Sequence, residues 1–197
     1  MIINPAPGNT PLDLDEMEGL IPSYVTTQSE LNQVEQQNIL QAAQWVIGHK
    51  ANGLLTDSFL RELHRRMLGD VWKWAGKYRI TGKNIGVPAS DIPGEIKKLC
   101  DDTGYWIENK TFPWNEIGAR FHHRLVAIHP YPNGNGRHAR LATDVLLRAH
   151  DQEAFAWGAR TAQDPLDRDG ENRRAYLNAL KAADQGDFGL LLKFVRS

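Results

Sequence analysis

The sequence is poor in the features that define several large classes of protein. Only one of its 197 residues is a cysteine, Cys100, which excludes an internal disulfide. Its place beside Ile96 and Leu99 in an apolar helical pattern favours a buried structural thiol over a nucleophile. No stretch approaches the roughly 18 apolar residues of a membrane span, and residues 1–5 lack the basic and apolar regions of a signal peptide. We therefore expect a cytoplasmic chain without a membrane segment.

Charge of one sign is also missing. Lys and Arg number 23, Asp and Glu 24, and the formal net charge is −1. Because the two signs are mixed and form no basic stripe, binding of nucleic acid through its phosphates is not expected. The length suits one domain with a terminal extension and is sufficient for a sizeable core.

The pattern of apolar residues predicts a mainly α fold. Residues 1–26 form an arm, because the stretch 4–26 is rich in Pro, Gly and Asp, and five of its apolar side chains are able to dock on the body: Leu12, Leu14, Met17, Leu20 and Ile21. Helical spacing and cap signals then predict helices over 27–49, 56–68, 91–108, 115–128, 137–150, 172–183 and 188–195. One small β-hairpin is predicted over 76–88, around the turn-forming Thr-Gly-Lys-Asn of residues 81–84.

One connection between two predicted helices carries most of the chemistry. It runs from His129 to Arg140 and reads His-Pro-Tyr-Pro-Asn-Gly-Asn-Gly-Arg-His-Ala-Arg. Gly134 and Gly136 are able to adopt backbone angles closed to other residues and leave room for a ligand. The free N–H groups at the start of the next helix face this loop, and Arg137 and Arg140 can reach further oxygens of a polyphosphate. The sequence thus predicts a phosphate site, with a nucleotide as the expected anion.

Several side chains of this connection have two interpretations. His129 has an ordinary pKa of about 6.5 and can act as a base or merely cap its helix; the adjoining cradle and arginines favour the base. Asn135 either bonds phosphate oxygens or holds the loop in shape. Arg137 and Arg140 are suited to neutralising the β- and γ-phosphates, although Arg140 in a surface salt bridge is an alternative. Residues 134–139 also fit a loose dinucleotide-binding pattern, but no strand precedes them.

These residues resemble the signature of the Fic (Fido-domain) family. That signature reads His-Pro-Phe, two residues of which the second is usually acidic, Gly-Asn-Gly-Arg, two residues and Arg. The chain matches it at His129, Pro130, Gly134, Asn135, Gly136, Arg137 and Arg140, with Tyr131 in place of Phe and Asn133 in place of the acidic residue. The resemblance extends to residues 74–79, 84–87 and 176–194, and is closest to a short bacterial subfamily called mobile mystery protein B.

The resemblance implies a Fic-type helical bundle and the activity of a protein adenylyltransferase. It divides the chain into an arm (1–26), an N-terminal helix region (27–55) and a Fido domain (56–197). In the family, the histidine at the position of His129 deprotonates a Tyr, Thr or Ser hydroxyl of a target protein. That oxygen attacks the α-phosphorus of ATP, and pyrophosphate leaves. Transfer of phosphate, UMP or phosphocholine, or a non-catalytic nucleotide-binding module, are the alternatives.

The resemblance also assigns a flap, a metal and a regulator. The hairpin flap would register the target by strand addition through Lys83, Asn84, Ile85 and Gly86; an ordinary hairpin packed on the core is the alternative. At the position of Asn133 the family usually carries an acidic ligand of Mg²⁺ or Mn²⁺, so we expect weakened metal binding. A toxin-like role with a separate antitoxin protein is implied as well.

Glu30 has two interpretations. Thr26 and Glu30 have the spacing of the family's inhibitory motif, whose glutamate pairs with the second arginine, here Arg140, but Leu31 replaces its Gly or Asn. Residues 27–30 also fit a capping box at the start of a helix. The histidines at 122, 123, 138 and 150 lack the spacing of a metal cluster.

Overall fold

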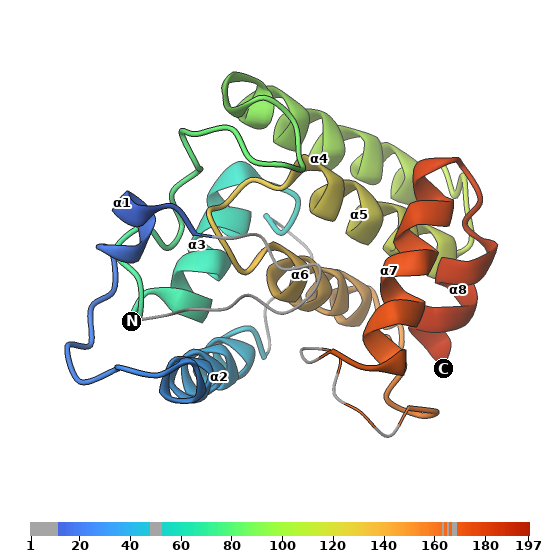
Figure 1. Ribbon diagram of the computed structural model, residues 1–197. Helices are drawn as coiled ribbons and strands as arrows, with labels where there is room; N and C mark the ends of the chain where they lie inside the picture. Colours follow the sequence, from blue (N-terminus) through green and yellow to red (C-terminus); the bar gives the residue numbers. More distant parts are fainter. Residues whose placement is uncertain (1–11, 48–52, 163, 165, 167–168) are drawn as a thin grey trace.

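The computed structural model describes residues 12–47, 53–162, 164, 166 and 169–197, and the regular elements in these ranges are helices (Figure 1). In chain order they are α1 (Leu14–Met17), α2 (Gln28–Trp45), α3 (Asp57–Leu68), the 3₁₀ turn η1 (Ala89–Asp91), α4 (Ile92–Glu108), α5 (Trp114–Ile128), α6 (Asn135–Ala149), α7 (Glu171–Asp184) and α8 (Gly189–Arg196).

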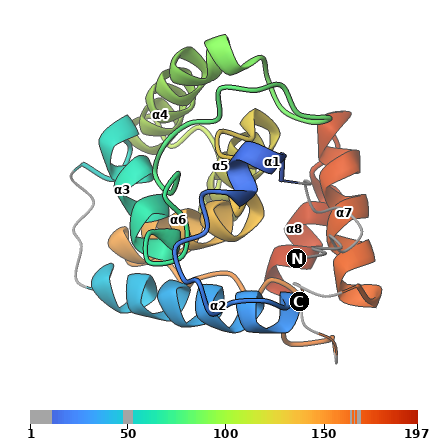
Figure 2. The same cartoon turned by 60° about the vertical axis from the view of Figure 1, so that its left-hand side comes forward.

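The antiparallel pair α5 and α6 forms the centre of the molecule. On one side α5 packs on α4, and α6 packs on α3, which also contacts α2 and α4. On the other side α5 packs on α8, which pairs with α7. The larger core lies among α2 to α6, and a second core joins the central pair to α7 and α8. Figures 1 and 2 show the arrangement of these helices. The site loop connects α5 to α6, and these two helices each contribute side chains to both cores.

The predicted helices are confirmed, with small shifts of their ends. The first predicted helix ends at Trp45, and residues 48–49 of its expected end lie outside the described residues. Helix α6 begins at Asn135, two residues earlier than predicted, because Gly134 forms its N-cap with φ 78° and ψ 2°. Arg137 therefore lies inside the first turn of α6 and does not begin it.

The predicted β-hairpin is not confirmed. Residues 76–88 contain no strand and form an irregular loop. The reason is that its two ends pair with a third segment and not with each other. Arg79 N–H donates to Pro130 O at 2.9 Å, and Val87 N–H donates to Ile128 O at 3.3 Å. We call residues 79–87 the flap loop.

The arm docks on the body through its main chain. Lys73 N–H donates to Gly19 O at 2.9 Å and Ile21 N–H to Val71 O at 2.8 Å, on either side of an isolated antiparallel bridge between Leu20 and Trp72. Of the predicted apolar anchors, Leu12 and Leu20 pack against the larger core, whereas Leu14 is 80% exposed. Figure 2 shows α1 lying across the front of the molecule, before α5.

Two sequence-based expectations concern single features of the body. Cys100 is buried on α4, and burial raises the pKa of its thiol to about 11, as expected for a structural cysteine. None of the helices within the described ranges is long and apolar enough to cross a membrane.

Candidate active site

The end of α5 places His129 at the start of the site loop. Its backbone is left-handed, with φ 53° and ψ 59°, which ends the helix and turns the chain. The side chain is buried, and burial, followed by the charges of Arg79 and Lys83, lowers its pKa from 6.5 to about 4. A hydrogen bond with the Val126 backbone opposes this shift. The imidazole is therefore neutral at pH 7 and able to accept a proton.

A reciprocal amide pair closes the site loop. Asn135 Oδ1 accepts from Tyr131 N–H at 2.9 Å, and Asn135 Nδ2 donates to Tyr131 O at 2.8 Å. Gly134 has a left-handed backbone, and a Cβ added to it would lie 2.7 Å from Leu68 Cδ1. Asn135 thus holds the loop in shape, which is one of its two expected roles, and only glycine fits at position 134.

A buried histidine of α3, His64, contacts the site loop through a hydrogen bond and a ring stack. His64 Nδ1 accepts from Gly76 N–H at 2.9 Å, so its proton lies on Nε2, which donates to Asn133 O at 3.1 Å. Its ring stacks on Tyr131, with 3.6 Å between ring centroids. His64 is fully buried and its pKa lies well below 6.5, first because of burial. It therefore remains neutral and keeps this tautomer at physiological pH.

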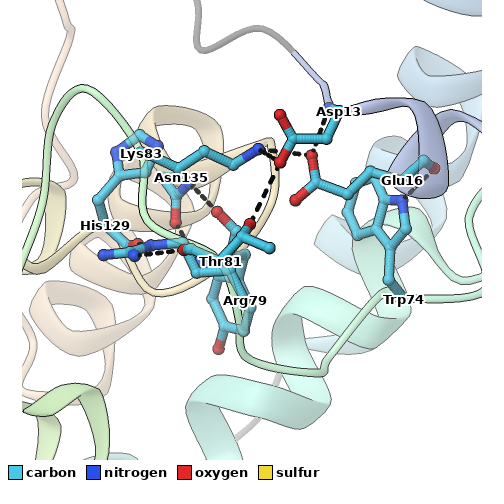
Figure 3. A network of polar contacts seen from close by, with 9 residues as sticks. Asp13, Glu16, Trp74, Arg79, Thr81, Lys83, His129 and Asn135 are labelled. Carbon is cyan, nitrogen blue, oxygen red and sulfur yellow. Dashed lines mark hydrogen bonds and ion pairs between the residues drawn. The ribbon is translucent and has the colours of Figure 1, made fainter. Parts of the chain in front are cut away.

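Arg79 fastens the flap loop to the site loop (Figure 3). Its Nε donates to His129 O at 2.7 Å and its Nη1 to Thr81 O at 2.9 Å. A third hydrogen bond runs from Nη2 to Val87 O. The guanidinium, which is buried, thus connects both ends of the flap loop to the residue that carries the candidate base.

Gly86 brings the flap loop into direct contact with His129. Its φ is +99°, and an added Cβ would lie 2.7 Å from His129 Cβ and 2.8 Å from Arg79 Nη2. A side chain is excluded here by both conformation and space. The other residues predicted for target docking lie on the same loop: Asn84 and Ile85 are exposed, and Lys83 is partly buried.

The exposure of Ile80 argues against the alternative in which the flap loop only packs its apolar side chains on the core. Ile80 is 91% exposed. Among the described residues, no backbone–backbone hydrogen bond starts from the N–H groups of residues 80–82 or 84–86. The loop consequently presents an exposed apolar side chain next to Arg79, whose guanidinium donates to His129 O.

The two arginines of the site lie in different surroundings. Arg137 Nη1 donates to the buried Glu35 of α2 at 2.7 Å, and the other carboxylate oxygen of Glu35 accepts from Trp72 Nε1 at 2.7 Å. Arg140 lies beside Gly136: a Cβ added to this glycine would be 3.9 Å from Arg140 Nη1. Arg137 also reaches the cradle, because a Cβ added to Gly134 would lie 3.9 Å from its Nη2. Both arginines thus border the cradle, and Arg137 is in addition paired with Glu35 of α2.

Arg140 belongs to an aromatic cluster at the base of α7. Its guanidinium carbon lies 5.9 Å from the centre of the Tyr176 ring, and Tyr176 Oη lies 2.9 Å from His122 Nε2. Burial, followed by the charge of Arg140, lowers the pKa of His122 to about 3. His122 is therefore a packed, neutral residue, while the neighbouring His123 lies 2.8 Å from Asp184.

Glu30 forms the capping box. Its carboxylate accepts from Thr26 N–H at 2.8 Å and from Thr27 N–H at 2.9 Å, while Thr27 Oγ1 accepts from Glu30 N–H at 3.2 Å. These hydrogen bonds, led by that of the Thr26 backbone, lower the pKa of Glu30 to about 2. In this arrangement the Glu30 carboxylate caps the start of its own helix. Inhibition through Arg140 stays a hypothesis, and it requires the carboxylate to leave the cap.

The side chain of Asn133 bonds within its own loop. Its Oδ1 accepts from the N–H of Gly134 at 2.5 Å, so the amide oxygen faces its own loop. Within the described ranges, no group of three or more His, Cys, Asp or Glu side chains is placed to hold a metal ion. A cage of charged side chains for a cation is therefore not seen among the described residues.

Sequence reasoning missed two polar residues that shape the site, His64 and Glu35. Both are polar residues on buried helix surfaces: His64 follows Leu63 on α3, and Glu35 lies with Asn38 between Leu31 and Ala42 on α2. A charged or polar residue within a buried face requires a partner. That signal was readable, but the partners, Asn133 and Arg137, are distant in sequence.

Comparison with known proteins identifies a family domain in the chain. Residues 54–147 match the family model described as Fic/DOC family, so the chain contains a Fic/DOC family domain. It is 28% identical over 148 residues to protein adenylyltransferase Fic of Aedes aegypti, covering 73% of this chain and 28% of the relative. It is 32% identical over 139 residues to the protein of that name in Drosophila grimshawi, covering 68% and 26%. The chain spans only about a quarter of the length of these curated relatives.

Solved Fic structures share the fold. A VirB-translocated effector from Bartonella quintana, represented by its N-terminal Fic domain, has a TM-score of 0.70 at 16% identity, covering 92% of this chain and 91% of that one. BepC from Bartonella tribocorum, solved with bound AMPPNP, has a TM-score of 0.67 at 16% identity, covering 93% and 97%. Since the curated relatives above are from insects, the matches do not place this chain in bacteria.

Proposed function

We propose that this chain is a Fic-type protein adenylyltransferase that transfers AMP from ATP to a Tyr, Thr or Ser hydroxyl of a target protein. The observation that carries the proposal is the neutral, buried His129, held by a left-handed backbone at the mouth of a glycine loop that opens helix α6. Relatives named protein adenylyltransferase Fic support the choice of reaction, and the nucleotide bound to BepC supports ATP as co-substrate.

The chemistry follows from the placement of these groups. The neutral imidazole of His129 takes the proton of the target hydroxyl as its oxygen attacks the α-phosphorus. The new P–O bond forms as the bond between the α-phosphorus and the bridging oxygen breaks, and pyrophosphate carries away the electron pair. The N–H groups at the start of α6 bind phosphate oxygens, and Arg140 stabilises charge on the leaving group. The flap loop aligns the target backbone beside His129.

The residues present fit a divalent cation only in part. A bound Mg²⁺ or Mn²⁺ would neutralise phosphate charge. In this chain Asn133 offers one neutral carbonyl oxygen, which bonds Gly134 N–H, so the nucleotide phosphates would have to supply most of the ligands. Weakened binding of the metal ion is therefore part of the proposal.

The decisive experiment follows the label of ATP. Purified protein is incubated with a bacterial lysate and ATP labelled at either the α- or the γ-phosphate, using wild type, His129→Ala and the matched control His123→Ala. His123 lies on the same helix but bonds Asp184. We expect label on protein from the α-position alone, loss in His129→Ala and retention in His123→Ala. Label from the γ-position would instead identify phosphate transfer, and equal labelling by His129→Ala would remove the proposed base.

A further inference from the structure

Lys83 of the flap loop is engaged by the arm. Its Nζ donates to Asp13 Oδ2 at 2.9 Å and to Glu16 Oε2 at 2.6 Å, and its side chain is only 4% exposed. Both carboxylates come from the beginning of α1, far away in sequence. A lysine on an otherwise exposed loop is thus covered by two acidic side chains of a different segment.

Thr81 completes the arrangement. Its Oγ1 donates to the same Asp13 Oδ2 at 3.2 Å, so one carboxylate oxygen accepts from both a hydroxyl and an ammonium group (Figure 3). We call Thr81 and Lys83 the carboxylate seat. It lies on the flap loop that Arg79 connects to His129 O, and Lys83 is near enough for its charge to act on His129.

The arm is weakly held where it covers the seat. Helix α1 has no buried residue, and its first turn contacts the body through the carboxylates of Asp13 and Glu16 and through Glu16 O, which accepts from Trp74 Nε1 at 3.0 Å. Directly before it, the partly buried Leu12 packs against the larger core. Segments with few buried apolar contacts open at low cost in free energy. Most of the main-chain anchoring of the arm comes later, around Gly19 and Ile21, so its first turn can detach without loss of the whole arm.

We propose that the carboxylate seat selects an acidic residue of the target segment that docks on the flap loop, and that Asp13 of the arm occupies the seat until the target arrives. This rests on the proposed function for the docking role of the loop. The specificity follows from chemistry: a hydroxyl and an ammonium group converge on one oxygen, which suits a carboxylate and leaves an amide less well bound. The exposed Ile80 next to Thr81 supplies an apolar contact for the same segment.

The test measures binding without nucleotide. The probes are short fluorescein-labelled alanine-based peptides with one tyrosine and one glutamate at varied distance from it, each with a glutamine twin. Fluorescence anisotropy is compared for wild type, Asp13→Asn/Glu16→Gln, and the control Asp15→Asn/Glu18→Gln, which removes equal charge from exposed positions of the same segment. Adding Lys83→Gln or Lys83→Arg to the first double variant tests the seat, and thermal unfolding confirms that each variant folds.

In the double variant Asp13→Asn/Glu16→Gln we expect the peptide with glutamate at one particular distance from the tyrosine to bind about tenfold more tightly than the same peptide with glutamine. This is the effect of one charge-assisted hydrogen bond. The preference should shrink in wild type and in the control, vanish with Lys83→Gln and persist with Lys83→Arg. Equal binding of the twins at every distance, or a preference that survives Lys83→Gln, would overturn the seat. Labelling from ATP is scored separately, so loss of preference with transfer intact refutes the seat alone, and a preference without transfer refutes only the proposed reaction.

Discussion

At the scale of single residues, Gly86 determines how closely the flap loop approaches the candidate base. Substitution Gly86→Ala would force a left-handed backbone on alanine, at about 1–2 kcal/mol, and place a methyl 2.7 Å from His129 Cβ. We expect transfer to fall about a hundredfold, because small displacements of a reacting group have effects of that size. The measurement is kcat/KM with α-labelled ATP, together with urea unfolding.

A matched control for this substitution exists in the same loop. A Cβ at Gly82 meets nothing within 4 Å, so Gly82→Ala should leave both the transfer rate and the free energy of unfolding close to wild type. If Gly86→Ala transfers AMP as fast as Gly82→Ala, close approach of the loop to His129 is not needed for the reaction.

His129 should also set the acid limit of activity. A general base works when neutral, and the folded pKa of His129 is lowered to about 4, so kcat/KM should stay level as pH falls from 7 and decline only as pH approaches that value. Lys83→Gln removes a charge that contributes to the shift and should move the decline towards higher pH. The remote, exposed Lys97→Gln should not. A decline centred near the ordinary histidine pKa would contradict the burial argument.

At the scale of elements, α2 carries two glutamates, Glu35 and Glu30, whose substitution should affect ATP binding differently. Glu35→Gln keeps an acceptor for Trp72 Nε1 but removes the charge that holds Arg137. We expect a loss of about 1–3 kcal/mol of stability, and ATP binding tighter by a factor of about 3–10 because Arg137 becomes available to phosphate. Calorimetric titration with ATP and urea unfolding would measure both effects.

The comparison variant is Glu30→Gln. If Glu30 acts only in the capping box, ATP affinity should be unchanged and only the start of α2 should be loosened, seen as faster amide exchange there. Tighter ATP binding by Glu30→Gln would instead support inhibition through Arg140. Unchanged ATP affinity in Glu35→Gln would show that Arg137 has no part in nucleotide binding.

Elements whose hydrogen bonds and packing are local in the sequence were predicted correctly, and those with distant partners were not. The apolar face Ile117, Phe121, Leu125 and Ile128 predicted α5 to within a residue, because helical hydrogen bonds and packing share one short period. The flap loop was predicted as a hairpin because its turn residues are local, whereas its hydrogen-bond partners lie at residues 128–130. No spacing rule reports such a distant pairing, and the same holds for Glu35 with Arg137.

The candidate site was predictable where its residues are contiguous. His129, Gly134, Asn135 and Arg140 lie in one run, and the structure gathers them around one loop. The direction in which each side chain points was not predictable, as Arg137 shows by turning to α2. Side-chain direction depends on neighbours supplied by other elements, which are unknown until the fold is known.

At the scale of the whole molecule, buried histidines should make stability depend on pH. The folded pKa is about 3 for His122 and about 4 for His138, in both cases first because of burial. For a depressed pKa, the stability is present above the ordinary value of about 6.5 and is lost as pH falls towards the folded value. The loss is on the order of 1 kcal/mol per histidine per pH unit. Urea unfolding at a series of pH values between 7 and the acid range would reveal it.

Asp144 should oppose this trend. It is largely buried between α6 and the segment of Phe155 and Trp157, and burial raises its pKa to about 6. A raised carboxyl pKa gives stability that is present below the ordinary value and is lost as pH rises through about 6. Asp144→Asn should therefore steepen the fall of stability on acidification. An unchanged pH dependence in this variant would show that Asp144 titrates normally.

The burial of Cys100 leaves the folded chain without a reactive surface thiol. Cys100 is the only cysteine of the sequence, and the pKa of its thiol is raised to about 11. We therefore expect maleimide reagents not to modify it in the native state. A cysteine introduced at an exposed position such as Ile85 would then be the one site to accept a dye, with the natural sequence otherwise intact. The protein is thus already suited to site-selective fluorophore attachment, and distances from the flap loop to a bound partner become accessible to energy-transfer spectroscopy.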